Sequence, residues 1–419
     1  MNLGHGKNGG IFMEDFRNNK SSSEIFAYLL ILSVTLSSYN INIGFALKPY
    51  MIIVGVFFIF KFSKFKFYRL RLFEIVMFVF YIYYCSTGLF AKYPEFSIRL
   101  IIGIIITLVS YIIMKDILSR VGILKLEKII STSGIIFNLA SIILYTIGMY
   151  SLHFNFIGNQ IRSYGLLVDR SVPRLIGTFS DPNIFCFCNF IFFYYYLTHL
   201  NSKSSKLGLL LSTITLLLTF SRGAILAVLL GLFIFFISVK VKTKVKMLVL
   251  GSIFVYLIIL IADSFFSIDI LEVITSRFES SAEDNGSGRF TLWEHGLTLF
   301  QNHPIFGIGI FNFRPYNNEY FGSHLYMHNT FLEILTESGL IGLTLYLLIF
   351  IVLVIEVCRK KYNISKSSYL LYTLPSMLVL LGSLSMTINE TFFLFLALVW
   401  RYLLEDSRLH HNSFSSKDG

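Results

Sequence analysis

The sequence predicts an all-α integral membrane protein with about twelve transmembrane helices. Of its 419 residues, 55% are hydrophobic and only 14% are charged, and the mean hydropathy is +0.70. Such a composition is typical of membrane proteins. A helix needs roughly 20 apolar residues to cross the hydrocarbon core of a bilayer, and runs of this kind recur from Ile25 to Leu404. We therefore expect no separate soluble domain.

The apolar runs define the predicted spans. We expect helices at 25–41, 44–60, 72–91, 97–114, 129–150, 183–199, 207–221, 223–239, 247–266, 330–357, 368–387 and 389–404. Only Ser221, Arg222 and Gly223 separate the seventh and eighth runs, so these two could also be counted differently. The predicted order is a cytoplasmic N-terminal segment (1–24), helices 1–9 (25–266), an outer loop (267–329), helices 10–12 (330–404) and a cytoplasmic tail (405–419). The first span is expected to be an uncleaved anchor.

Basic residues in the short loops predict the orientation, because cytoplasmic loops retain lysine and arginine during insertion. Their distribution places both termini in the cytoplasm. The predicted outer side instead favours arginine, whose planar fork binds phosphate with two hydrogen bonds. Its cations are Arg99, Arg162, Arg170, Arg174, Arg222, Arg277, Arg289 and Arg314, against only Lys48 and Lys92. This surface is predicted to bind an anion, unless the arginines only contact lipid headgroups or pair with Asp169, Glu279, Asp284 and Glu294.

Two outer segments are longer than ordinary connections and are predicted to carry the function. The first, from Ser151 to Pro182, contains several arginines and ends in a run from Gly177 to Asn183. In that run Asp181 and Pro182 also fit the start of a helix. Arg222 stands between two apolar runs, where a charge is costly unless it faces a cavity or a partner, so we interpret it as functional.

The second outer segment runs from Ser267 to Met327. Within it an apolar stripe at helical spacing predicts an amphipathic helix on the membrane surface, with Arg289 in its first turn and its end at His303-Pro304. The stripe consists of Phe290, Trp293, Leu297 and Phe300. Backbone donors in the first turn of a helix favour anions, which suits the position of Arg289.

Motifs for nucleotides, redox cofactors and metals are missing from the sequence. There is no Walker loop, Rossmann fingerprint or zinc-spaced set of His and Cys, so we expect neither a cofactor nor a bound metal. The four cysteines, which suggest no disulfide framework, are Cys85, Cys186, Cys188 and Cys358. No nucleic-acid partner is expected.

The motifs between Ser221 and Gly342 resemble the O-antigen ligase and polymerase superfamily. The resemblance rests on the order of three elements: the run Gly288 to Trp293, the run His303 to Gly309, and His328-Asn329 followed after nine residues by Gly339-x-x-Gly342. Ser221-Arg222-Gly223 is similar to the arginine that the family carries in its middle spans. Each element alone is weak, and their order together with the predicted spans carries the resemblance.

The resemblance implies a glycosyltransferase of GT-C-type architecture with a long outer loop between helices 9 and 10. It would act at the outer face of the bacterial inner membrane, with an undecaprenyl-diphosphate-linked oligosaccharide as donor and a growing glycan as acceptor. Arg222 and Arg289, with Arg174 as a weaker third, are expected to stabilise the leaving diphosphate. Further expected substrate contacts are Arg314, Asn329, Glu333 and Asp181.

His328 is the predicted catalytic base for the attacking sugar hydroxyl. An imidazole with an ordinary pKa of ~6.5 can begin neutral and accept a proton during the reaction. The alternative is a polar residue at a helix entrance, with Asn329 as the cap of that helix. Glu333 and Glu337 could pair with His328 or with the outer arginines, and their spacing does not decide between these partners.

The shared signature does not separate a polymerase from a ligase. We predict a polymerase of the O-antigen or capsular type, because the aromatic-rich outer loops and the run from Gly177 to Asn183 are more similar to that branch. The alternatives are a ligase that transfers the glycan to a lipid core or another acceptor, and a flippase that moves the same lipid without a reaction. The resemblance also points to a chain-length regulator as a partner.

Overall fold

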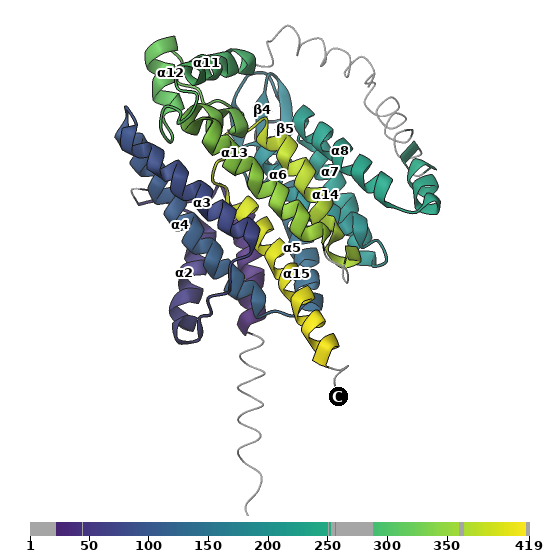
Figure 1. Ribbon diagram of the computed structural model, residues 1–419. Coiled ribbons are helices and arrows are strands. Elements are labelled where there is room, and N and C mark those ends of the chain that lie inside the picture. Colours follow the sequence, from purple (N-terminus) through teal and green to yellow (C-terminus); the bar gives the residue numbers. More distant parts are fainter. Residues whose placement is uncertain are drawn as a thin grey trace, which may run out of the picture.

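The computed structural model describes residues 22–43, 45–249, 251–252, 256, 288–359 and 364–415, and these form a mainly helical bundle (Figure 1). Within these described residues, four helical segments are long and apolar enough to cross a membrane: Leu72–Phe90, Pro94–Ser119, Ile123–Ser151 and Thr330–Cys358. Shorter apolar helices are Ser22–Val34, Arg222–Ser238 and Ser368–Leu381. A mainly helical fold with candidate membrane spans is thereby confirmed, while the full number of spans and the GT-C architecture stay predictions.

Capping residues and prolines mark where the helices begin. Pro49 opens α2 (Pro49–Lys61) and Pro94 opens α4 (Pro94–Ser119), positions at which proline lacks only an N–H that the helix would not use. Asp181 caps α6 (Pro182–Thr198), since its side chain accepts hydrogen bonds from the backbone N–H groups of Asn183 and Ile184. The other long helices are α3 (Leu72–Ser86), α5 (Ile123–Ser151), α7 (Lys203–Leu218), α8 (Arg222–Ser238), α13 (Thr330–Cys358), α14 (Ile364–Leu381) and α15 (Glu390–Ser415).

The ends of some predicted spans differ from the helices observed. The first span was predicted to reach residue 41, but its helix ends at Val34, and a hairpin of β1 (Ile41–Asn42) and β2 (Ala46–Leu47) follows. The Thr35 hydroxyl donates to the carbonyl of Leu32, a local bond of the kind that competes with helix continuation. Most of the ninth predicted span, 247–266, and residues 267–287 of the outer loop lie outside the described residues.

The outer segment after α5 folds into a small sheet that the all-α prediction did not include. Strands β3 (Ile161–Ser163), β4 (Leu166–Asp169) and β5 (Val172–Leu175) pair antiparallel in that order. The buried strand β4 packs on α5. Strands of three or four residues give too short an alternating pattern to be recognised within an arginine-rich loop.

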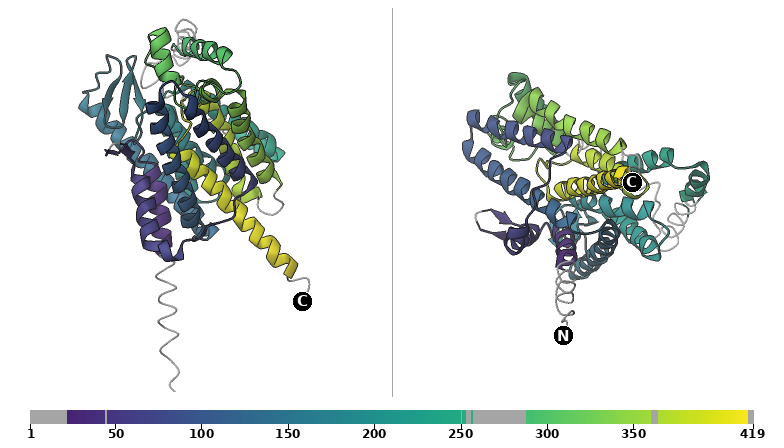
Figure 2. Two further views of the ribbon diagram at one scale, coloured as in Figure 1. Left: turned by 60° about the vertical axis from the view of Figure 1, so that its left-hand side comes forward. Right: turned by 60° about the horizontal axis from the view of Figure 1, so that its bottom comes forward.

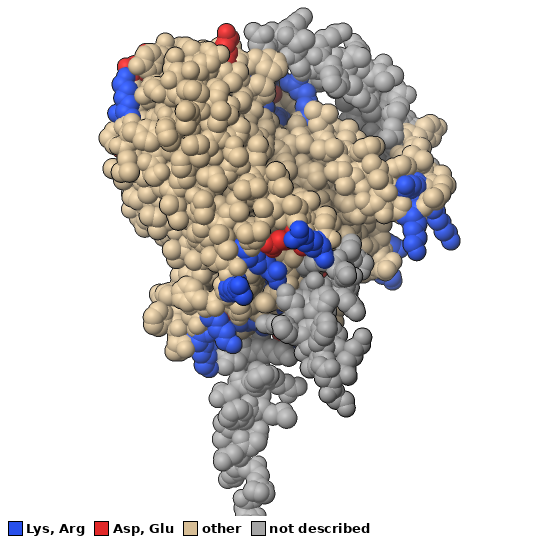
Figure 3. Space-filling model, viewed as in Figure 1, with Lys and Arg blue, Asp and Glu red and all other residues tan. Residues whose placement is uncertain are grey.

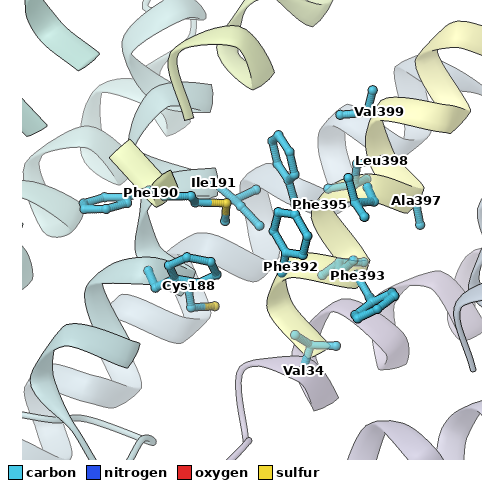
Figure 4. Close-up of a cluster of buried hydrophobic side chains, with 14 of the residues drawn as sticks. Val34, Cys188, Phe190, Ile191, Phe392, Phe393, Phe395, Ala397, Leu398 and Val399 are labelled. Atoms are coloured by element: carbon cyan, nitrogen blue, oxygen red, sulfur yellow. The ribbon is translucent and has the colours of Figure 1, made fainter. Parts of the chain in front are cut away.

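The helices pack into one bundle around an aromatic core. Helix α13 lies on α3, α14 on α6 and α8, and α15 on α4, so the last three helices of the chain pack between earlier helices (Figure 2). Phe190 of α6 and Phe392 of α15 belong to this core, with Val34 nearby (Figure 4). Both phenylalanines are less than 10% exposed, and burial of such side chains contributes about 1.5–3 kcal/mol each.

The two ends of the bundle differ in structure and charge. The sheet, α11 (Arg289–Asn302) and α12 (Phe313–Phe321) lie together at one end (Figures 1 and 2). On the face shown in Figure 3, lysine and arginine gather towards the opposite end, and a broad uncharged band lies above them. We call the end with the sheet the outer end and the other the inner end, following the orientation predicted from basic loops.

Candidate active site

Four helices begin close together at the outer end. The hydroxyl of Ser221, which caps α8, donates to the side-chain oxygen of Asn183 in the first turn of α6. The indole N–H of Trp293 in α11 donates to the carbonyl of Met327, just before α13, over 3.2 Å. Gly223 of α8 lies against α14. Because the N-terminus of a helix carries partial positive charge and unpaired N–H groups, four such ends in one region favour an anion.

Burial and nearby charges shift the ionisation of two side chains at these helix starts, Arg289 and His328. Burial lowers the pKa of Arg289, Asp181 raises it, and the cations Arg174 and Arg222 lower it again. Burial also lowers the pKa of His328, Arg289 lowers it further, and Asp181 opposes both. Electrostatic effects decline with distance, so the five groups occupy one region. At neutral pH the imidazole is uncharged, whereas the guanidinium groups stay charged.

Arg174 is held in place by the sheet and by the turn between α7 and α8. Its guanidinium lies 3.0 Å from a carboxylate oxygen of Asp169 and donates to the carbonyl of Thr219, also over 3.0 Å. The pair with Asp169 matches the structural alternative considered for the outer arginines. It also fixes the direction of a guanidinium group that contributes to the field at Arg289.

Arg222 is the first residue of α8, and its side chain is exposed at the outer end. Ser221 accepts a 3.1 Å hydrogen bond from the backbone N–H of Ala224, so the break between the two apolar runs is a capped helix start. The charge is therefore carried at a helix end and acts on Arg289.

The backbone of His328 is held in the left-handed region, with φ of 51°. Its N–H donates to the hydroxyl of Ser385 over 2.9 Å. The neighbouring Thr330 is tied to the same turn, because its hydroxyl donates to the carbonyl of Leu384 (2.6 Å) and accepts from the N–H of Met386 (3.0 Å). The turn between α14 and α15 thus positions the imidazole, and nothing in the sequence pattern pointed to Ser385.

Asn329 caps α13, as one of the two sequence interpretations expected. Its side-chain oxygen accepts hydrogen bonds of 3.1 Å from the backbone N–H groups of Phe331 and Leu332. One turn later, Glu333 is buried at 3% exposure, and Ser385 is a hydrogen-bond partner of its side chain. Its Oε2 atom has no hydrogen-bond partner among the described residues. Glu333 therefore lies beside the turn that holds His328.

The glycine motifs form a crossing between the outer loop and α13. At Gly339 the helix is interrupted, with φ of 67° and ψ of −168°. The freed carbonyls of Thr336 and Glu337 accept from the N–H groups of Ile308 (3.0 Å) and Gly309 (2.9 Å). These bonds align the outer loop with the broken turn of the helix.

The crossing is closed by Glu337, whose carboxylate accepts from the hydroxyl of Tyr84 and from two backbone N–H groups of the outer loop. The donors are Phe311 at 2.8 Å and Phe313 at 3.0 Å. With its oxygens used in this way, Glu337 anchors the loop to α13 and does not pair with the outer arginines in the described contacts. Arg314 is held elsewhere: it donates to the carbonyl of His324 (2.8 Å) and to the hydroxyl of Tyr326 (3.1 Å).

Helix α11 packs on α13 by a face other than the predicted stripe. Leu292, Gly296 and Leu299 are buried, whereas Phe290 and Leu297 of the stripe are 55% and 42% exposed. Phe290 and Leu297 thus remain on the outside, whereas Trp293 and Phe300 are half-buried. Trp293 packs against the buried cluster that includes Leu299 and Met327, so a position of the whole stripe on a membrane surface stays a prediction. Among the residues the structure describes, no three His, Cys, Asp or Glu side chains are grouped to hold a metal ion.

Residues 207–347 match the family model described as O-antigen ligase. The matched segment is about a third of the 419-residue chain and contains Arg222, Arg289 and His328. This match supports assignment to the O-antigen ligase and polymerase superfamily and confirms the resemblance seen in the motifs. A search of curated proteins found no match.

Proposed function

We propose that this chain, whose assignment to the O-antigen ligase and polymerase superfamily is supported by the family match, polymerises lipid-linked glycan. Its donor is an oligosaccharide repeat unit on undecaprenyl diphosphate, and its acceptor is a second such unit or a growing chain. The reaction takes place at the outer face of the bacterial inner membrane. The observation that carries this proposal is the proximity of charged groups beside four helix starts: Asp181, Arg174 and Arg222 act on Arg289, and Arg289 and Asp181 act on His328.

The charge of this cluster suits a diphosphate leaving group. Three guanidinium groups and the helix N-termini exceed the two carboxylates beside them, that of Asp181 and that of Asp169, which pairs with Arg174, so the region attracts an anion. The field is already in place before the reaction, and fixed donors of this kind stabilise charge as it develops on the leaving oxygen. Loss of one such donor typically reduces turnover by about 10²–10³-fold.

The lowered pKa of His328 suits a general base. A hydroxyl oxygen of the acceptor sugar attacks the anomeric carbon of the donor, while its proton passes to the uncharged imidazole. The bond between the anomeric carbon and the phosphate oxygen breaks, and undecaprenyl diphosphate leaves with the bonding electron pair. Arg222 and Arg289 stabilise the diphosphate, and the protonated His328 returns its proton to solvent.

A ligase is the second candidate, because the matching family model carries that description. The same cluster serves either reaction, since both release the lipid diphosphate and differ only in the acceptor. The choice therefore depends on which acceptor the purified protein uses.

The decisive experiment gives the purified full-length protein only lipid-diphosphate repeat units. A polymerase forms a ladder of longer glycans, a ligase forms product only after a lipid-core or other acceptor is added, and a flippase forms no new glycosidic bond. We expect a ladder that His328→Ala abolishes while membrane insertion is retained. The control His153→Ala changes an exposed histidine that does not contribute to the field at Arg289 or His328, and it should leave the ladder intact. A full ladder from His328→Ala would refute the proposed base.

A further inference from the structure

A second candidate binding site lies at the inner end, far along the chain from the motifs discussed above. There a pocket of about 570 Å³ lies between the start of α3, the last turn of α13 and the middle of α15. Polar and aromatic side chains line it together with leucines: Arg69, Arg71, Glu356, Tyr68 and Trp400. Its volume falls in the usual range for small-ligand sites.

Glu356 gives the pocket an unfilled hydrogen-bonding position. Its Oε1 atom accepts from the backbone N–H groups of Leu72 (2.8 Å) and Phe73 (3.3 Å), which caps α3. Its Oε2 atom is buried and has no hydrogen-bond partner among the described residues. A buried carboxylate oxygen without a donor is unfavourable, so a ligand that brings an N–H group would improve this site.

The other side of the pocket offers positive charge and aromatic surface. Arg69 is exposed, and Arg71 is half-buried beside it. The ring of Tyr68 packs against Trp400 with centroids 4.9 Å apart, and the hydroxyl of Tyr68 is bonded to Ser119 over 2.6 Å. Amphipathic rings at the end of a helix bundle suit the boundary between lipid tails and headgroups, and basic pockets there bind phosphate.

We propose that this pocket binds the headgroup of a phospholipid that carries both a phosphate and a primary ammonium group, such as phosphatidylethanolamine. The arginines take the phosphate, and the ammonium group donates to the Oε2 atom of Glu356. Leu404 and Trp400 line the same pocket and offer apolar surface to the first carbons of the acyl chains. A phosphate without an amine would leave Oε2 unfilled, and a choline headgroup has no N–H to donate.

The test compares three lipids with identical acyl chains on the full-length protein in detergent, by native mass spectrometry and thermal melting. The lipids are phosphatidylethanolamine, phosphatidylcholine and phosphatidylglycerol. We expect phosphatidylethanolamine to bind about tenfold more tightly than phosphatidylcholine, because one charge-assisted hydrogen bond is gained. Equal binding of the two lipids would overturn the proposal, and stronger binding of phosphatidylglycerol would show a site for phosphate alone.

Two variants test whether the preference for phosphatidylethanolamine arises from this pocket. Glu356→Gln keeps a carbonyl oxygen that can still cap α3 but removes the charge, and it should abolish the preference over phosphatidylcholine. Arg69→Gln should weaken the binding of all three lipids, because each carries a phosphate. Glu24→Gln is the matched control, because Glu24 lies outside the pocket and pairs with Lys125. An unchanged preference in Glu356→Gln would contradict the proposed ammonium contact, and none of these measurements depends on glycan transfer.

Discussion

The hydroxyl oxygen of Ser385 accepts a hydrogen bond of 2.9 Å from the backbone N–H of His328. This contact joins the turn after α14 to the residue that precedes the cap of α13. His328 has φ of 51°, a conformation that costs of order 1–3 kcal/mol for a residue other than glycine, so the surrounding bonds must hold it. The imidazole is thus directed by a partner 57 residues away in the sequence.

Replacement of Ser385 by alanine should lower kcat with little change in KM, because the base loses its orientation while the anion site stays. We expect a decrease of roughly tenfold or more, since a small displacement of a catalytic group is costly. Ser385→Thr keeps the hydroxyl and should restore turnover. The control Ser86→Ala removes an exposed hydroxyl with only a local bond to Tyr83. A rise in KM alone would assign Ser385 to substrate binding instead.

Arg222→Lys and Arg289→Lys should each lower turnover although the charge is kept. Lysine lacks the planar fork that binds two phosphate oxygens at once, so we expect a decrease of about tenfold or more. Steady-state assays with the lipid-linked donor measure this effect. Arg162→Lys, in the exposed strand β3, serves as the control. Normal turnover in both cluster variants would remove these arginines from the leaving-group site.

The pH dependence of turnover should report the charges around His328. Its pKa lies below the ordinary 6.5, so activity should fall only as the pH drops through that lower value and the base becomes protonated. Arg289→Gln removes a nearby cation, which raises the pKa and moves the acid limb of the remaining activity to higher pH. Asp181→Asn can still cap α6 but removes the opposing anion, so it should move the limb to lower pH. Shifts in the same direction in both variants would contradict this assignment.

Helix positions followed from the sequence more readily than the arrangement of the site. Apolar runs of spanning length predicted the ranges that α5, α6 and α8 occupy closely, because run length is a local property. The order of the motifs led us to expect His328 and Arg289 in one region, and in the structure the charge of Arg289 lowers the pKa of His328.

Other parts of the site depend on contacts that no local pattern records. Ser385 is an ordinary serine in a turn, and its role arises only when that turn meets α13. Glu337 could have paired with the arginines by its spacing, but its carboxylate is used by Tyr84 and the outer loop. The bonds of Arg314 to His324 and Tyr326 likewise follow from no local pattern, and its contact with substrate stays a prediction.

Gly307→Ala and Gly339→Ala should destabilise the crossing of the outer loop with α13. A Cβ atom would lie 2.3 Å from the carbonyl carbon of Glu337 in the first case and 2.1 Å from the carbonyl oxygen of Ile305 in the second. Both residues also have positive φ, of 73° and 67°. We expect a loss of at least about 2 kcal/mol and a lower melting temperature. Gly55→Ala, in α2 with open space around it, should melt normally; equal melting of all three variants would show that the crossing contributes nothing.

Removal of divalent ions should leave turnover unchanged. Arginine side chains and helix N-termini supply the positive charge that a metal ion provides in other glycosyl transfer sites, and they would repel a cation. Turnover with EDTA and with added magnesium measures this. Loss of activity in EDTA with recovery in magnesium would disprove the arginine-based stabilisation of the leaving group.

Because the helix is interrupted at Gly339, the first part of α13 has a fixed length. This segment begins at Asn329, next to the hydrogen bond between His328 and Ser385, and it ends at Gly339, which contacts Ile305. An inserted residue would advance the far end by about 1.5 Å and rotate it by about 100°, so the glycine would face away from the loop. The contact of His328 with Ser385 and the contact of Gly339 with Ile305 could then not form at the same time. The nine residues between Asn329 and Gly339 are therefore set by the geometry of the helix and not by the chemistry of the reaction.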